Sequence, residues 1–358
     1  DELESGLCPD HQKTLERVEE ENYFFRLSNY QRQLEDIIGN DVVQVYPDNR
    51  KREMLAFIKQ GLEDFSISRS VERAHGWGVP VPADKGQIMY VWFDALTNYI
   101  TALDYTTSQK LFKKYWDQER QSKRRVSHVL GKGVARFHLV YWLAMLLSAG
   151  EKLPTEEFVH AYITVNGEKM SKSIGNVVNP HDLARQYGAD PVRYFFLGAV
   201  SPAQDGDFNE ERFQEYYTAH LVNGVGNLTS RVITMLEKYA KGVIPCQCGD
   251  IFETQQFWQN YDHAFAEYRF DEVVQGIQSM VTRLDASTNQ ERPWEKANGG
   301  EDVSPCLYRL AEALRHIAVA LLPIIPDSAN KILAQLGTKE TGQDWGKLQE
   351  GDRIGKKE

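Results

Sequence analysis

Short apolar runs and amphipathic segments follow each other along the N-terminal part of the chain. β-Branched and aromatic side chains fill residues 87–93, which predicts a buried strand. Helical spacing follows, with these apolar side chains on one face: Leu96, Tyr99, Ile100 and Leu103. Residues 126–133 show the same pattern of a strand before a helix: an apolar run ends at a glycine turn, and a nearly continuous apolar helix follows at about 134–148. Two successive strand–helix units predict a parallel sheet with crossover helices.

Proline and glycine mark the ends of other elements. Short helices are predicted over 27–38 and from Arg52 to a stop at Gly61. Pro80 and Pro82 are incompatible with a helix interior, so the chain around them is predicted to be extended.

Two Asx-Pro pairs predict helix starts. Asn179 is expected to cap a helix whose first position is Pro180, and Gly188 to end it. Asp190 and Pro191 are expected to open the next helix in the same way.

The C-terminal part of the sequence is periodic at helical spacing almost throughout. From Phe213 onward, helices are predicted at about 213–240, 253–286, 304–322 and 327–336. Such a succession of long amphipathic helices is typical of a helix bundle. The predicted fold class is therefore α/β followed by an all-α part.

Composition limits the possible classes. The 358 residues are enough for two or three domains. A net charge of −10 argues against a broadly basic nucleic-acid binder, and the basic run at 110–125 is interpreted as a solvated face. No stretch approaches the roughly 18 apolar residues of a membrane span, and the acidic first residues are unlike a signal peptide. A first residue Asp1 suggests a fragment or a processed chain.

The four cysteines are too sparse for a disulfide framework, so a reducing compartment is expected. Cys8 and His11 have the spacing of half a metal knuckle without a second half. Cys246 and Cys248 are two residues apart, which is not a usual zinc spacing. All four cysteines, Cys306 included, are predicted to be structural.

The predicted sheet also locates a site. In open parallel sheets, ligands bind beyond the carboxyl ends of the strands. These residues follow the two predicted strands: Trp92, Asp94, Gly131, Lys132 and Gly133.

A cationic loop carries the strongest chemical signal. The polar stretch 166–176 follows a predicted strand at 158–165. It contains the pentapeptide Lys169, Met170, Ser171, Lys172 and Ser173. Lysine charges, serine hydroxyls and backbone N–H groups can hold a triphosphate and stabilise charge on a leaving pyrophosphate. An arbitrary loop of this kind is more often a solvated turn, but its place between a strand and a capped helix favours the functional reading.

KMSKS is the second signature of class I aminoacyl-tRNA synthetases, and its surroundings resemble the methionyl-tRNA synthetase family. The similar stretches follow in family order over nearly the whole chain: EENYFFRLSNYQ, GLEDFSISR, WGVPVP, YVWFDALTNYITAL, HVLGKGVARFHLVYW, AYITVNGEKMSKSIGNVVNPHDLARQYGADPVRYFFL and RPWEKA.

The resemblance implies a fold and a domain order. The fold is the second half of a Rossmann-type catalytic domain with part of a connective insertion, followed by an anticodon-binding helix bundle. The implied segments are 1–87 (end of the insertion and return to the catalytic domain), 88–148 (second Rossmann half), 149–210 (KMSKS and stem-contact region), 211–340 (anticodon-binding domain) and 341–358 (tail).

The resemblance also implies a methionine pocket. The matching positions are Phe65, Trp92, Ala95, Leu96, Tyr99, Val134 and His138. Aromatic rings suit the polarizable thioether of methionine. His138 is four residues after Val134, so both lie on one helix face. Without the resemblance, each of these residues reads as core packing.

ATP, with Mg²⁺ on its phosphates, is the second implied substrate. The positions matched to the nucleotide are Gly131, Lys132, Arg69, Lys169 and Lys172, and the whole pentapeptide is implied to be catalytic. Asp94 is expected near the amino-acid end of the site.

The resemblance implies tRNA(Met) as the partner of the helical part. Asn227 and Arg231, one turn apart, and Pro293-Trp294 match the positions that read the CAU anticodon. Unpaired bases can stack on Trp and hydrogen-bond to Asn and Arg. Taken alone, Trp294 could equally be a staple at a helix start.

The sequence also departs from the family. The first class I signature, the HIGH-type histidine motif, is absent, as is the strand–helix unit that carries it. The stretch at 8–11 resembles a knuckle with His11 in place of a cysteine, so no structural zinc is expected. Gly133 replaces an aspartate that often contacts the ribose, and Leu143 replaces a usual proline.

The expected activity is ATP-dependent formation of methionyl-adenylate and transfer of methionine to tRNA, only together with the missing N-terminal segment. Two alternatives stay open: a class I synthetase for another amino acid, and a non-catalytic tRNA-binding module descended from a synthetase. No membrane partner is expected. A cytoplasmic location is expected, with an organellar one possible.

Overall fold

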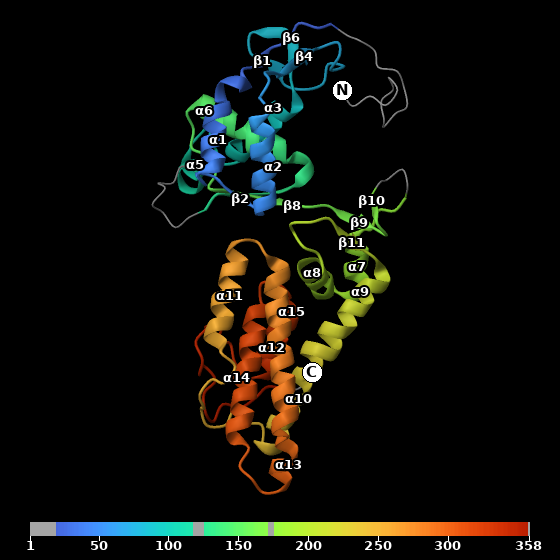
Figure 1. Cartoon of the computed structure of the whole chain (residues 1–358), viewed down its shortest axis with the longest axis vertical. Helices are drawn as coiled ribbons and strands as arrows, with labels where there is room; N and C mark the ends of the chain where they lie inside the picture. Colours follow the sequence, from blue (N-terminus) through green and yellow to red (C-terminus); the bar gives the residue numbers. More distant parts are fainter. Residues whose placement is uncertain (1–18, 117–124, 171–174, 357–358) are drawn as a thin grey trace. The chain divides into compact units, whose positions relative to one another are not determined.

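The computed structural model describes residues 19–116, 125–170 and 175–356 (Figure 1). The chain divides into two compact units, Asp1–Phe158 (unit 1) and Val159–Glu358 (unit 2). Each unit has hydrophobic cores of its own. None of the described helices is long and apolar enough to cross a membrane.

The strands of unit 1 are short and belong to separate sheets. Strand β1 (Phe24–Phe25) pairs antiparallel with β3 (Phe65–Ser66), and β4 (Ser68–Ser70) and β5 (Pro80–Val81) flank β6 (Asp84–Met89). A third sheet has the order β2 (Gln44–Tyr46), β8 (Glu156–His160), β7 (Ser127–Gly131). Strands β2 and β8 are parallel, with Tyr46 opposite Phe158.

The prediction for residues 87–93 is wrong in two respects. Strand β6 ends at Met89, and helix α3 (Val91–Leu96) begins within the run. The strand is antiparallel to both its neighbours and does not share a sheet with β7. An apolar run of this length does not by itself distinguish a strand from the start of a buried helix. The extended chain predicted around Pro80 is confirmed as β5.

The helices of unit 1 agree better with the sequence. They are η1 (Leu27–Tyr30), α1 (Gln31–Gly39), α2 (Asp48–Lys59), α3, α4 (Asn98–Thr101), α5 (Lys110–Tyr115), η2 (Lys132–Val134), η3 (Phe137–Trp142) and α6 (Leu143–Ala149). The predicted apolar face is confirmed, because Leu96 and Ile100 are buried in one core with Trp142. The apolar helix predicted from Val134 is also present, but η3 within it is a π-helix.

Unit 2 begins with a small sheet and a helix pair. Its sheet has the order β10 (Glu168–Lys169), β9 (Ile163–Val165), β11 (Gly206–Phe208). Helices α7 (Pro180–Tyr187) and α8 (Ala189–Gly198) pack together. The single strand predicted at 158–165 is therefore wrong, because the chain leaves β8 at His160 and starts β9, in another sheet, at Ile163.

One of the two predicted helix caps is confirmed. The Asn179 side chain accepts a hydrogen bond from the His181 N–H, and Gly188 follows the end of α7. Asp190 does not cap α8. It lies inside the first turn of α8, buried, and accepts a 2.6 Å bond from the Ser328 N–H at the start of α15. A carboxylate near a helix start can serve any helix whose free N–H groups are within reach.

The rest of unit 2 is mainly helical, as predicted, but the single helix predicted at 253–286 is wrong, because the helix breaks at 267–269. One continuous stretch comprises α9 (Glu210–Tyr217), the π-helix η4 (Thr218–Gly226) and α10 (Asn227–Tyr239). It is followed by α11 (Thr254–Ala266), α12 (Phe270–Glu291), α13 (Pro293–Asn298), α14 (Ser304–Leu321) and α15 (Pro326–Gln335). Helices α10, α12 and α15 all contact α14, so the predicted bundle is confirmed (yellow to red in Figure 1).

A buried carboxylate fixes the C-terminal tail on this bundle. Glu312 of α14 is completely buried and accepts two hydrogen bonds from Arg315, at 3.0 and 2.7 Å. It also accepts the backbone N–H groups of Gly346, Lys347 and Leu348, at 2.9, 2.9 and 3.1 Å. A buried charge is tolerated only when its lone pairs are satisfied in this way.

The partners of Glu312 are themselves held in place. Arg315 donates to the carbonyls of Gly342 and Asp344, at 2.7 and 2.9 Å. His316 Nδ1 accepts the indole N–H of Trp258 at 2.8 Å. Burial alone would raise the pKa of Glu312, but the hydrogen bonds from His316 and Arg315 outweigh burial and lower it to about 2.

This network predicts acid sensitivity. The folded-state pKa of Glu312 lies below its ordinary value of 4.5, so its contribution is complete above pH 4.5 and is lost as the pH falls toward 2. The shift corresponds to about 3 kcal/mol. Replacing Glu312 with Gln should lower the free energy of urea unfolding at pH 7 by about 3–5 kcal/mol, because Arg315 then stays buried without its partner. The variant should also lose most of the pH dependence between 4.5 and 2.

The control is Glu291→Gln, which removes a half-exposed ion pair with Lys296. Its effect should stay below about 1 kcal/mol. Equal effects of the two substitutions would contradict the assigned role of Glu312.

Candidate functional site

In unit 1, a tyrosine–histidine pair lies at the centre of the predicted methionine pocket. The Tyr99 hydroxyl is 2.7 Å from His138 Nε2, and His138 Nδ1 is 2.9 Å from the carbonyl oxygen of Val134. A carbonyl only accepts, so Nδ1 carries the proton. In the neutral ring Nε2 is then the acceptor, and Tyr99 donates to it.

The His138 ring is kept neutral by its surroundings. The side chain is buried, and burial is the main cause that lowers its pKa below the ordinary 6.5. Burial, with the nearby Glu157 carboxylate, raises the pKa of Tyr99. A neutral imidazole beside an undissociated phenol suits an uncharged ligand group such as a thioether better than an ion.

Further aromatic rings stack on the helical stretch that carries His138. Trp92 stacks on Phe137 with ring centroids 4.3 Å apart, and Phe65 stacks on Tyr141 at 4.2 Å. Phe137 and Tyr141 meet edge to face at 5.4 Å. The structure therefore brings Phe65, Trp92 and His138 to the same helical stretch, residues 134–141.

The other predicted pocket residues differ in exposure. Val134 is partly buried and supplies its carbonyl to His138, whereas Ala95 is exposed. Leu96 is only 3% exposed and packs in the core with Trp142. Its contacts in unit 1 are those of a core residue, so its role toward a ligand stays a prediction.

Sequence reasoning missed a buried polar pair below Tyr99. His128 Nδ1 lies 2.9 Å from Glu157 Oε1, with side chains 5% and 0% exposed, and the ring of Tyr99 stacks on His128 at 4.2 Å. His128 Nε2, Glu157 Oε2 and the indole nitrogen of Trp142 have no hydrogen-bond partner within the described residues. Polar residues inside apolar strand sequences, SHVLG and EEFVH, were the available signal.

The residues matched to the nucleotide are spread over several elements. Gly131 ends β7, and Lys132 begins η2 directly after it, with Gly133 exposed beside them. Arg69 extends from β4 over the ring of Tyr90, 5.1 Å from its centroid. Asp94 lies in the first turn of α3. Their arrangement around a nucleotide remains a prediction.

The KMSKS loop is described only at its start. Lys169 ends β10, and its ammonium lies 5.9 Å from the ring centroid of Tyr162. Met170 packs against the small core formed by Val165 and Leu183 among others, which anchors the start of the loop. Ser171, Lys172 and Ser173 lie outside the described residues.

In unit 2, the predicted anticodon residues gather around one guanidinium. Arg231 forms an ion pair with Asp285, donates to Asn289 Oδ1 at 2.7 Å, and lies 5.9 Å from the ring centroid of Trp294. Pro293 is buried at the first position of α13 and orients Trp294. Asn227 is exposed one turn before Arg231 on α10. Asp285 and Asn289, both on α12, were not predicted.

The cysteines and possible metal ligands fit no metal site in the described part of the chain. Cys246, Cys248 and Cys306 are free thiols, and no group of three or more His, Cys, Asp or Glu side chains among residues 19–116, 125–170 and 175–356 is placed to hold a metal ion. Cys8 and His11 lie outside these residues.

Comparison with known proteins identifies the family of this chain. The family model of class I tRNA synthetases (M) matches residues 1–233. The methionine–tRNA ligases of Thermosynechococcus vestitus and Streptomyces coelicolor are 41% and 36% identical, over 94% and 98% of this chain and 64% and 68% of their own lengths. The chain belongs to the methionyl-tRNA synthetase family.

Solved structures of methionyl-tRNA synthetases support the same fold. The Mycobacterium tuberculosis enzyme bound by methionyl-adenylate has a TM-score of 0.84 and 32% identity, and the match covers 97% of this chain and 70% of that one. The fold is thus a Rossmann-type part followed by a helix bundle. The chain spans less than two thirds of the length of several curated relatives, 64% of the Thermosynechococcus protein and 57% of the Thermotoga maritima one.

The Tyr99–His138 bond predicts a measurable tautomer. Long-range ¹H–¹⁵N NMR at pH 7 should show His138 neutral with its proton on Nδ1, and a titration should give a pKa below 6.5. Tyr99→Phe should raise that pKa, because the donor that opposes protonation of Nε2 is lost. Tyr105→Phe, which removes a hydroxyl bonded to Glu151 in the same unit, should leave it unchanged. A proton on Nε2 of the neutral ring would contradict the assignment.

Proposed function

We propose that this chain carries the larger part of a methionine–tRNA ligase. It acts on methionine, ATP with Mg²⁺, and tRNA(Met), in the cytoplasm or, as the alternative, in an organelle. The observation that carries the proposal is the neutral His138 held by Tyr99, on the same helical stretch as Phe137 and Tyr141, which stack with Trp92 and Phe65. Family membership and the relatives' methionine–tRNA ligase names support it.

The amino acid is selected by uncharged contacts. The rings of Trp92 and Phe65 offer polarizable surface to a thioether, and the Tyr99 hydroxyl and His138 provide a polar edge that a purely aliphatic side chain does not match. Because both residues are neutral at pH 7, they do not attract a charged side chain. Methionine is therefore preferred over lysine or glutamate and, by shape and polarizability, over leucine and valine.

The reaction has two balanced steps. A carboxylate oxygen of methionine attacks the α-phosphorus of ATP, the bond to the β-phosphate breaks, and pyrophosphate leaves. The terminal ribose hydroxyl of the tRNA then attacks the adenylate carbonyl, and AMP leaves. Lys169 and Lys172 of the KMSKS loop supply positive charge to the phosphates as pyrophosphate departs. The Mycobacterium tuberculosis relative was solved with methionyl-adenylate, the product of the first step.

The bundle reads the anticodon in this proposal. The Trp294 ring is the stacking surface for an unpaired base, and Arg231 and Asn227 supply donors to base edges. Asp285 and Asn289 hold the guanidinium of Arg231 in position before RNA arrives. A prepositioned donor loses less conformational entropy on binding.

Activation requires a segment that the printed sequence does not contain. The HIGH-type histidine signature, which serves the ATP phosphates in the family, is absent from it. Methionine-dependent exchange of labelled pyrophosphate into ATP should be undetectable with this chain and should appear once a segment with the signature is supplied. Leucine, valine and cysteine should not support it.

Tyr99→Phe in the reconstituted enzyme should lower kcat/KM for methionine roughly tenfold, since one hydrogen bond is lost. Tyr105→Phe is the matched control. Exchange driven by another amino acid would identify a different synthetase, and no exchange after reconstitution would favour a tRNA-binding module without catalysis.

Anticodon binding can be tested on this chain alone. Trp294→Ala should weaken binding of an RNA hairpin with the CAU anticodon loop roughly tenfold or more, measured by fluorescence anisotropy, because a stacking surface is lost. A hairpin with a changed anticodon should bind the parent weakly and be less affected by the substitution. Trp77→Ala removes a tryptophan that is 77% exposed and should change neither affinity. Equal losses for both hairpins would argue against anticodon reading by Trp294.

A further inference from the structure

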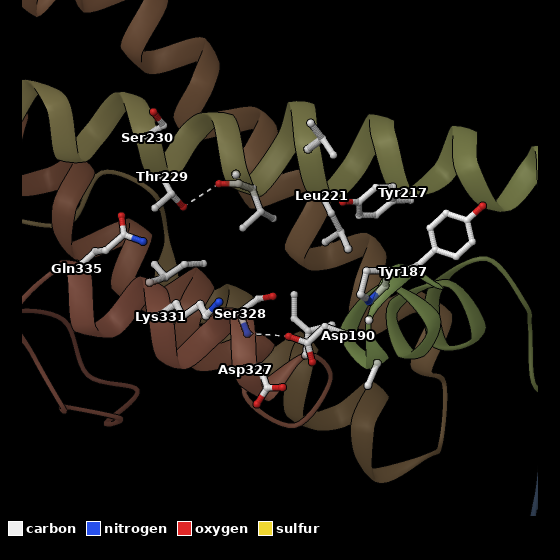
Figure 2. Close-up of a pocket in the computed structure, with 18 residues that line it drawn as sticks. Tyr187, Asp190, Tyr217, Leu221, Thr229, Ser230, Asp327, Ser328, Lys331 and Gln335 are labelled. Atoms are coloured by element: carbon white, nitrogen blue, oxygen red, sulfur yellow. Dashed lines mark hydrogen bonds between the residues drawn. The ribbon is translucent and has the colours of Figure 1, made fainter. Parts of the chain in front are cut away.

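A cavity of about 500 Å³ lies in unit 2 apart from the predicted anticodon cluster (Figure 2). Its walls come from three places: the α7–α8 junction, the stretch from the end of α9 to the start of α10, and the whole length of α15. Small-molecule sites in proteins commonly have this size. None of the roles proposed above uses this cavity.

The wall from η4 and α15 is mainly apolar. It contains Leu221, Val225, Ile325 and Ile332. Gly226 lets the π-helix keep its backbone geometry, since a Cβ at this position would lie 2.9 Å from the carbonyl oxygen of Leu221 in the same helix. Segment η4 is a π-helix, a distortion that is frequent at functional sites. An apolar ligand could therefore pack against this wall, in a cavity that is partly open to water.

Two side chains of α15 bring unused polar groups to one end of the cavity. Lys331 and Gln335 are one turn apart, and Figure 2 shows both side chains toward the space opposite Thr229. Gln335 is only 9% exposed. Neither side chain has a hydrogen-bond or ion-pair partner within the described residues, so both polar groups are available to a ligand in the cavity.

Two carboxylates line the rest of the cavity: Asp190, which is already hydrogen-bonded, and Asp327 in the first turn of α15. The Asp190 carboxylate accepts the Ser328 N–H at 2.6 Å, drawn as a dashed line in Figure 2. Thr229 donates its hydroxyl proton to the Val225 carbonyl at 2.7 Å, so its oxygen can still accept. An anion is therefore repelled from the Asp190 end and attracted to the Lys331 end.

We propose that this cavity binds a small monoanion with an apolar body. Its carboxylate, or a similar acidic head, lies against the Lys331 ammonium and the Gln335 amide. Its body covers Leu221, Val225 and Ile332. The proposal does not depend on the aminoacylation chemistry, because no residue that lines the cavity has a role in the proposed reaction.

The test uses two fluorescent probes that differ in charge. 8-Anilinonaphthalene-1-sulfonate is an apolar monoanion, and N-phenyl-1-naphthylamine is the same body without the acid group. The parent chain should bind the anion more tightly. Lys331→Met should weaken binding of the anionic probe roughly tenfold, since a charge-assisted hydrogen bond is lost. The affinity of the neutral probe should change less than about twofold.

Gln335→Leu nearly keeps the side-chain size. It should weaken binding of the anionic probe several-fold and leave the affinity of the neutral probe unchanged. Lys339→Met makes the same charge change outside the cavity and is the matched control. Circular dichroism verifies that each variant is folded. If one of the two cavity variants does not fold, the other is enough for the test. An unchanged affinity of the anion in the folded cavity variants, or an equal loss in Lys339→Met, would overturn the proposal.

Discussion

The arrangement of the helix bundle depends on one buried carboxylate. Glu312 collects hydrogen bonds from a guanidinium and three backbone N–H groups, and thereby ties the tail at 346–348 to the middle of α14. Helix α14 contacts α10, α12 and α15, so the position of each depends on it. An uncharged residue could fill the same volume, but it would leave Arg315 and those N–H groups without an acceptor. The anticodon cluster and the Lys331 cavity are both built on helices that this core holds.

In unit 1, the buried polar group is neutral, in contrast to the charged Glu312 of unit 2. His138 donates to a backbone carbonyl and accepts from Tyr99, which uses both ring nitrogens of the neutral form. Protonation of Nε2 would force the Tyr99 hydroxyl to accept where it now donates, and would place a cation in a buried site. The pair below it, His128 and Glu157, keeps a carboxylate close enough to raise the pKa of Tyr99. The aromatic cluster therefore stays uncharged although acidic and basic groups lie beside it.

The sequence allowed the helices to be predicted far better than the sheets. Helical periodicity over many residues, as in α12 and α14, leaves little ambiguity, and Asn179 caps its helix by a purely local bond. Pairing between strands is not local: β6 and β7 follow similar apolar runs, yet lie in different sheets. Asp190 has a cap signature but bonds to Ser328, which is distant in sequence. In the site, the roles of the motif residues stay predictions, and the contacts of His128 and Asp285 are tertiary ones that spacing along the chain does not reveal.

The helical stretch from η4 to α10 contributes to both the Arg231 cluster and the Lys331 cavity, which the sequence alone did not relate to each other. Successive residues of an α-helix are rotated by about 100°, so positions two apart lie on nearly opposite faces. Arg231 faces Asp285 and Trp294, whereas Thr229 faces the cavity and bonds back to Val225. Both faces of α10 are therefore packed against different partners. A rotation of α10 that improved one set of contacts would disturb the other, so the π-helical segment before it sets the register for both.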